Sequence, residues 1–120
     1  MPRPTKCRRV CHFPETVEFV PKGEASGEYL VLTVDEFEAI RLIDREGLSQ
    51  EECGAQLCVG RTTAQKIYET ARRKLADILV LGLSLKIEGG DFNLCNGNTE
   101  LCYKRDCAKR QSPAVLRTEE

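Results

Sequence analysis

Seven cysteines in a chain of 120 residues draw attention first, because thiolates are good ligands for zinc and other soft metal ions. An odd number cannot be fully paired as disulfides within one chain. In a reducing cytoplasm, clustered cysteines more often bind metal or remain thiols. The candidate ligands flank the middle of the chain and include its single histidine: Cys7, Cys11, His12, Cys95, Cys102 and Cys107.

If the two ends of the chain meet, four of these six groups would close a tetrahedral zinc site that holds irregular segments together. An iron–sulfur cluster is a second candidate, because it also takes thiolate ligands, but zinc is preferred. The spacings differ from the two close C-x2-C pairs of a zinc ribbon, so the alternative is a set of surface thiols. Cys53 and Cys58 are expected to be small apolar residues at tight packing positions.

A second group of residues, within 61–74, has the chemistry of DNA recognition. Arginine pairs with guanine, glutamine with adenine, and threonine with several base edges, while later basic residues suit phosphates. The alternative is an ordinary helix with a solvated basic face. The predicted DNA-binding residues are Arg61, Thr62, Thr63, Gln65, Lys66, Arg72, Arg73 and Lys74.

Two helices and a tight turn are predicted to position this group. Ser49 and Glu52 form the S-x-x-E pattern of a helix start, and that helix ends near Leu57. The turn at 58–60 leads into a longer helix over 61–81, which Gly82 ends. Together these features predict a helix-turn-helix whose second helix enters the major groove.

The remaining elements complete a mainly α fold: a helix-turn-helix three-helix core with a small β appendage formed by the N- and C-terminal segments. The preceding helix is expected over 35–45, and short strands over 17–20 and 29–34. A strand pair, 84–87 with 92–94, is expected around Gly89-Gly90-Asp91. The buried stripe of the long helix is predicted to be Ala64, Ile67, Tyr68, Ala71, Leu75, Ile78 and Leu79. Three zones follow: a basic, cysteine-bearing segment 1–34, the helix-turn-helix domain 35–82, and a β pair with a cysteine-containing tail, 83–120.

Composition and motifs indicate which classes of protein this chain is not expected to belong to. Hydrophobic residues make up 41% and charged residues 31%, which argues for a packed domain rather than disorder. No apolar run approaches the roughly 18 residues of a membrane span, and no secretory signal is recognised, so a cytoplasmic protein is expected. The net charge is −1, but basic residues gather in 1–14 and 53–74, whereas 15–52 is acidic. Catalytic motifs are not found, and an enzyme is not expected.

Several segments together resemble UPF0251, also called DUF134, a family of small prokaryotic proteins. The match covers about residues 1–92, through Pro2-Arg3-Pro4, the C-R-R-V-C run at 7–11, and segments 35–42, 46–52, 71–76 and 87–90. The resemblance implies a DNA-binding protein whose helix-turn-helix is similar to region 4 of sigma factors. This chain departs from the usual pattern at the turn, with Cys58 where glycine is expected and Gly60 where a serine cap is common.

The leading hypothesis is therefore a transcriptional regulator that reads double-stranded DNA, as a homodimer because one helix-turn-helix reads few base pairs. A second hypothesis adds sensing, with the cysteine cluster responding to metal or redox state. A third is a module that docks a partner such as RNA polymerase through the acidic 15–52 segment. Apolar residues that could pack the small sheet or a second subunit are Leu79, Val80, Leu81, Leu83 and Leu85.

Overall fold

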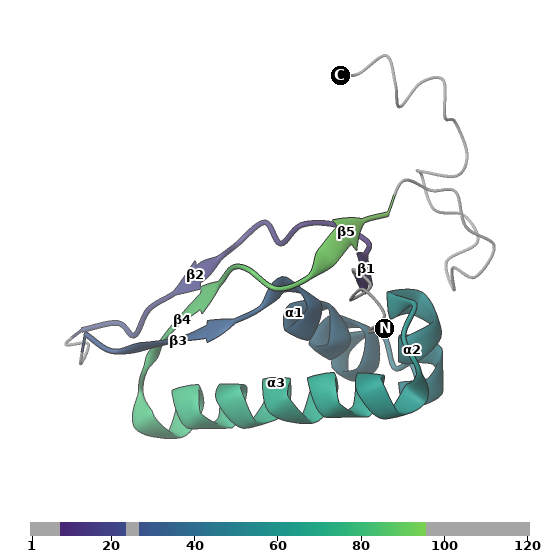
Figure 1. Cartoon of the computed structure of the whole chain (residues 1–120). Helices are drawn as coiled ribbons and strands as arrows, with labels where there is room; N and C mark the ends of the chain where they lie inside the picture. Colours follow the sequence, from purple (N-terminus) through teal and green to yellow (C-terminus); the bar gives the residue numbers. More distant parts are fainter. Residues whose placement is uncertain (1–7, 24–26, 96–120) are drawn as a thin grey trace, which may run out of the picture.

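The computed structural model describes residues 8–23 and 27–95, in which three α-helices are accompanied by short strands (Figure 1). This arrangement confirms the mainly α fold with a small β appendage. In chain order the elements are β1 (Arg8–Val10), β2 (Glu18–Phe19), β3 (Tyr29–Leu32), α1 (Val34–Ile40), the π-helical turn η1 (Arg41–Arg45), α2 (Gln50–Leu57), α3 (Arg61–Leu81), β4 (Ser84–Ile87) and β5 (Phe92–Leu94).

Local sequence signals account for the helix ends. The backbone N–H of Ser49 donates to Glu52 Oε1 (2.8 Å), and the N–H of Glu52 donates to Ser49 Oγ (3.0 Å), which is the predicted capping box of α2. Gly82 ends α3 in the left-handed conformation, with φ +67°. The predicted helix over 35–45 is α1 followed directly by η1.

The strands form two separate small sheets. In one, β4 lies between β2, to which it is antiparallel, and β3, to which it is parallel. In the other, β1 pairs with β5 in parallel, so the two ends of the described chain lie side by side (Figure 1). Lys74 joins α3 to the first sheet, because its Nζ donates to the carbonyl oxygen of Val31 (2.9 Å).

The expected pairing of 84–87 with 92–94 is wrong. Gly89 and Gly90 have φ values of +77° and +93°, but they lead the chain across the start of α1 instead of back onto β4. The carbonyl oxygen of Gly89 accepts from the N–H of Val34 (3.1 Å). A Cβ on Gly90 would lie 2.8 Å from Thr33 Cβ, so only glycine fits this crossing. β5 is thereby directed to β1.

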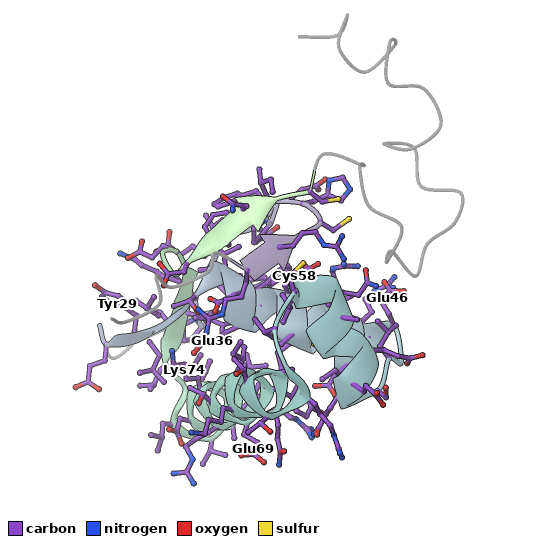
Figure 2. The ribbon with its side chains drawn as sticks, turned by 45° about the vertical axis from the view of Figure 1, so that its right-hand side comes forward. Tyr29, Glu36, Glu46, Cys58, Glu69 and Lys74 are labelled. Carbon is purple, nitrogen blue, oxygen red and sulfur yellow. The ribbon has the colours of Figure 1, made fainter. Side chains whose placement is uncertain are left out.

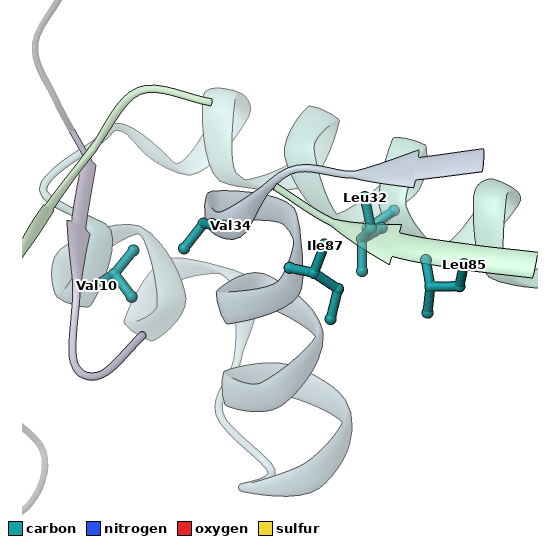
Figure 3. Close-up of a cluster of buried hydrophobic side chains, with 6 residues drawn as sticks. Val10, Leu32, Val34, Leu85 and Ile87 are labelled. Atoms are coloured by element: carbon teal, nitrogen blue, oxygen red, sulfur yellow. The ribbon is translucent and has the colours of Figure 1, made fainter. Parts of the chain in front are cut away.

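Two hydrophobic clusters share the core. One joins β1, β3, β4, the start of α1 and the middle of α3, and Figure 3 shows most of its members. They are Val10, Leu32, Val34, Ala71, Leu85 and Ile87. The other cluster holds the three helices together through Ala39, Leu42, Cys53, Leu57, Ala64 and Ile67. Over the described part of the chain, no helix is both long and apolar enough to cross a membrane.

Candidate nucleic-acid interface

The crossing of α2 and α3 is set by the closeness of two backbones. The N–H of Val59 donates to the carbonyl oxygen of Gly54 (2.9 Å). A Cβ on Gly54 would lie 2.9 Å from the carbonyl oxygen of Val59, so a larger residue does not fit without movement of the turn. Leu57 is fully buried beneath this turn. The small residue and the apolar anchor thus hold α3 at a fixed angle to α2.

The turn itself tolerates two unusual residues. Cys58 is exposed and left-handed, with φ +63° and ψ +40°, and it ends α2 where glycine would adopt this conformation without strain. Gly60 is the N-cap of α3, with an extended φ of −71° and no side chain to accept a hydrogen bond from the first turn. The first turn of α3 contains no acidic residue.

The start of α3 presents its polar residues to solvent. Arg61, Thr62, Gln65 and Lys66 are exposed and Thr63 is half-buried. The opposite face carries Ala64, Ile67 and Ala71, all of which are buried against the body of the protein. The structure therefore brings the predicted base-reading residues together on the outer side of one helix end.

Glu69 adds a negative charge to the same outer face. Its Oε2 accepts from Gln65 Nε2 (3.1 Å), and Figure 2 shows its side chain pointing away from the rest of the molecule. Gln65 is thus held along the helix and oriented by its neighbour. The charge of Glu69 disfavours close approach of a phosphate at this turn of the helix.

The three basic residues predicted to bind phosphates have different surroundings. Arg73 is exposed. Arg72 lies over the ring of Tyr68, with Cζ 5.6 Å from the centroid, and its Nε is 3.6 Å from Asp44 Oδ2. Lys74 points the other way, toward α1, where its Nζ lies 2.7 Å from Glu36 Oε1 (Figure 2). Lys74 is therefore part of the framework of the fold, not of the outer face of α3.

Tyr68 fixes α3 against η1 beside this surface. Its hydroxyl donates to Asp44 Oδ1 (2.7 Å), and this hydrogen bond, with burial, raises the pKa of the tyrosine. Leu79, predicted to belong to the buried stripe, is 83% exposed. This prediction is wrong because Leu79 lies outside the packed face of α3, whereas Ile78 in the same last turn packs against the hydrophobic core. Val80 and Leu81 are exposed too, whereas Leu85 is buried in the core.

β1 supports α2 from behind, which the sequence did not predict. Arg9 Nε donates to the carbonyl oxygen of Gln56 (2.7 Å), in the last turn of α2. The main signal for β1 is one apolar residue, Val10, between basic residues and a cysteine, and this is too little for a strand pattern. Arg9, from the basic run at the start of the chain, therefore has a structural role at the end of α2.

The predicted metal ligands are only partly within the described residues. Cys11 and Cys95 directly follow the paired strands β1 and β5, and His12 comes next to Cys11. Cys7, Cys102 and Cys107 lie outside the described residues. Across residues 8–23 and 27–95, no three histidine, cysteine, aspartate or glutamate residues gather closely enough to hold a metal ion.

The chain is similar to one protein family and to proteins that carry the name of that family. The family model "Protein of unknown function DUF134" matches residues 1–95. A UPF0251 protein of Desulfitobacterium hafniense is 53% identical over 111 residues, covering 88% of this chain and 89% of its own. A UPF0251 protein of Pelotomaculum thermopropionicum is 44% identical, covering 98% of this chain and 88% of its own. No solved structure matches the chain significantly. On these matches, the chain belongs to the DUF134 (UPF0251) family.

Proposed function

We propose that this protein binds double-stranded DNA and regulates transcription, with the start of α3 in the major groove. One observation carries the proposal. Arg61, Thr62, Gln65 and Lys66 share the exposed end of a helix that α2 holds by a backbone contact at Gly54. These side chains can donate to or accept from base edges, and the helix end that carries them is accessible.

The charges in the first turn of α3 also favour DNA. The N-terminus of a helix carries a partial positive charge, and the first turn of α3 has no acidic residue to cancel it. Arg73, three turns further along, is exposed and available to a phosphate. Arg72 is already next to Asp44, and Lys74 is held by Glu36, so both are expected to contribute less.

The experiment is selection of fragmented genomic DNA on the purified, reduced protein at moderate salt, followed by sequencing. A shared motif among the recovered fragments is expected. Because one such helix reads few base pairs, we propose that two copies bind together, so the motif should have two-fold symmetry. Uniform recovery of all fragments would show only electrostatic attraction and would contradict sequence-specific binding.

Substitutions then separate base reading from phosphate contact. Arg61→Ala should cost about 1–3 kcal/mol on the selected motif and relax its sequence preference. Arg73→Ala should weaken binding to every sequence and reduce the slope of log K against log salt by about 1. Lys22→Ala is the matched control, because Lys22 is exposed in the segment between β2 and β3, far from α2 (Figure 1). If Arg61→Ala behaves like Lys22→Ala, the groove assignment is wrong.

A module that docks RNA polymerase is the competing function. Complete absence of DNA binding at low salt would favour it. Within the acidic segment 15–52 predicted to make that contact, the carboxylates of α1 are held inside the protein, whereas others, such as Glu15 and Glu51, are exposed. Asp35, Glu36 and Glu38 are all buried, and each lies next to a basic side chain of the protein itself. This burial favours DNA binding over docking through α1.

A further inference from the structure

A cavity of about 390 Å³ lies between two parts of the chain that are distant in sequence: the segment that links β1 to β2, and the junction of α1 with η1. Ligand cavities in proteins measure about 300–1,000 Å³, so this one has room for a small molecule with a single ring. Its lining residues are His12, Phe13, Pro14, Glu15, Phe37 and Arg41. Aromatic and charged side chains therefore border the same space.

One wall of the cavity is the place where the helix changes its hydrogen-bond pattern. The N–H of Glu46 donates to the carbonyl oxygen of Arg41 (2.9 Å), so η1 is a π-helical turn that begins at a lining residue. π-Helical turns are rare, and they occur frequently at functional sites. The turn and the cavity are separate observations, and they coincide at Arg41.

Carboxylates neutralise the guanidinium in this wall and leave an excess of negative charge. Arg41 Nη2 lies 2.7 Å from Glu38 Oε2, and Arg41 Nη1 lies 3.5 Å from Glu46 Oε2. Glu15, which is exposed, has no ion pair within residues 8–23 and 27–95. An anion in the cavity would therefore approach three carboxylates and only one guanidinium, whereas a cation would be attracted.

Two phenyl rings add apolar walls that also suit a cation. Phe13 is 47% exposed, and its ring lies against that of Phe92, with the centroids 6.1 Å apart. Phe37, in α1, is half-buried and packs against the core. The face of an aromatic ring attracts a cation, and aromatic cages recognise quaternary ammonium groups in this way.

We propose that this cavity binds a small organic cation, an ammonium group carried on an apolar body. Phe13 and Phe37 contact the ligand with their rings, and Glu15 supplies the opposite charge. An organic cation uses all three of these side chains. An organic anion of the same size would use only the apolar walls.

The cavity is distinct from the proposed DNA interface, but it is next to the element that holds α3. Asp44, in η1, accepts a hydrogen bond from the hydroxyl of Tyr68, and its Oδ2 lies 3.6 Å from Arg72 Nε. None of the lining residues belongs to α2 or α3. The ligand site therefore goes beyond the proposed function and is tested without DNA.

The test is titration of the full, ¹⁵N-labelled chain with benzyltrimethylammonium, followed by NMR. The pH is about 7.5, where an ordinary imidazole is largely uncharged, so that His12 adds little positive charge. Shifts are expected at the amide signals of residues 12–15 and 37–41, with a Kd on the order of 1 mM. Benzoate and benzyl alcohol have the same ring with a negative charge or none, and should bind at least about tenfold more weakly.

A pair of double variants separates the proposed contacts from general effects on the fold. Phe13→Leu with Glu15→Gln removes one ring face and the unpaired carboxylate, and should weaken binding of benzyltrimethylammonium by about tenfold. Phe19→Leu with Glu18→Gln is the matched control, because Phe19 in β2 is 50% exposed and outside the cavity. The control should bind as the wild type does, and the amide spectra of both variants show whether the fold is kept.

Three results would each overturn the proposal. They are the absence of shifts at residues 12–15 with the probe at about twentyfold the expected Kd, equal affinity for benzoate and benzyltrimethylammonium, and equal affinity of the two double variants for the probe. None of these measurements involves DNA, so the outcome is independent of the proposed function.

Discussion

The carbonyl oxygen of Val59 lies where a side chain on Gly54 would have to go: a Cβ there would be 2.9 Å from that oxygen. The two residues belong to the turn and to the helix before it, and the N–H of Val59 also donates to the carbonyl oxygen of Gly54. The angle between α2 and α3 thus depends on the absence of a side chain at one position. The orientation of the proposed base-reading residues relative to the rest of the protein depends on the same contact.

Gly54→Ala is accordingly expected to destabilise the fold by about 1–3 kcal/mol, as overpacking does in other tight contacts. On an open helix surface the same change would stabilise by about 1 kcal/mol, so the predicted sign is opposite to helix propensity. Urea unfolding followed by circular dichroism measures the difference. Ala55→Ser, at the exposed neighbouring position, should change stability by less than about 0.5 kcal/mol. Increased stability of Gly54→Ala would contradict the close contact.

Cys58 provides the converse case, a side chain at a position that suits glycine. Its φ of +63° is costly for a residue with a Cβ, and its exposed side chain contributes little packing. Cys58→Gly should therefore stabilise the protein by about 1 kcal/mol, with the entropy of the unfolded chain offsetting part of the relief. Cys58→Ala removes the thiol but keeps the strain, so its unfolding midpoint should stay near that of the wild type. Equal midpoints for the two variants would contradict the strain at this turn.

These two residues show what the sequence could and could not predict. The helix ends were predicted well, because capping boxes, terminal glycines and apolar spacing are local signals. Pairing of β5 with β1 was not, because it depends on how Gly89 and Gly90 cross the start of α1, which is a contact between distant segments. Short strands with one or two apolar residues carry too little pattern to specify a partner.

For the candidate interface too, the local features were predictable from the sequence, whereas the contacts with other elements were not. Exposure of Arg61, Thr62, Gln65 and Lys66 follows from the helical period, and the structure agrees. The period could not show that Lys74 reaches across to Glu36, because its stem extends from the half-buried side of α3 toward another element. Leu79 was misassigned because periodicity identifies the apolar face of a helix but not how far around the helix the packing extends: Ile78 packs against the core, and Leu79 is exposed.

Substitutions of the neighbouring residues Arg73 and Lys74 are expected to change different properties: DNA binding for Arg73 and stability for Lys74. Lys74→Met removes the cationic partner of the largely buried Glu36 and a donor to the Val31 carbonyl, and should cost about 1–2 kcal/mol of unfolding free energy. Arg73→Met removes the same formal charge from an exposed position and should leave stability nearly unchanged while weakening DNA binding. Chemical denaturation and DNA titration of both variants provide the comparison. A larger loss of stability in Arg73→Met than in Lys74→Met would reverse the assignment.

The raised pKa of Cys53 is expected to make the free energy of unfolding depend on pH in the alkaline range. Burial, together with the nearby Glu38 carboxylate, raises the pKa of this thiol from 9.0 to about 11 in the folded protein. The thiol form is thus favoured by folding. Its contribution to stability is fully present below pH 9 and is lost as the pH rises toward 11, by about 2–3 kcal/mol in all. Tyr68, whose pKa is also raised, acts in the same direction.

The measurement is the difference in unfolding free energy between wild type and Cys53→Ala, taken at several pH values from about 8 to about 10. Taking the difference cancels the titration of Tyr68 and of the lysines, which both proteins share. Cys53→Ala is less stable at neutral pH because it leaves a small cavity in the helical cluster. That deficit should shrink as the pH rises, because only the wild-type unfolded chain gains free energy by ionising this thiol. A deficit independent of pH would show that Cys53 ionises equally in the folded and unfolded states, and that the packing between α1 and α2 is looser than its full burial indicates.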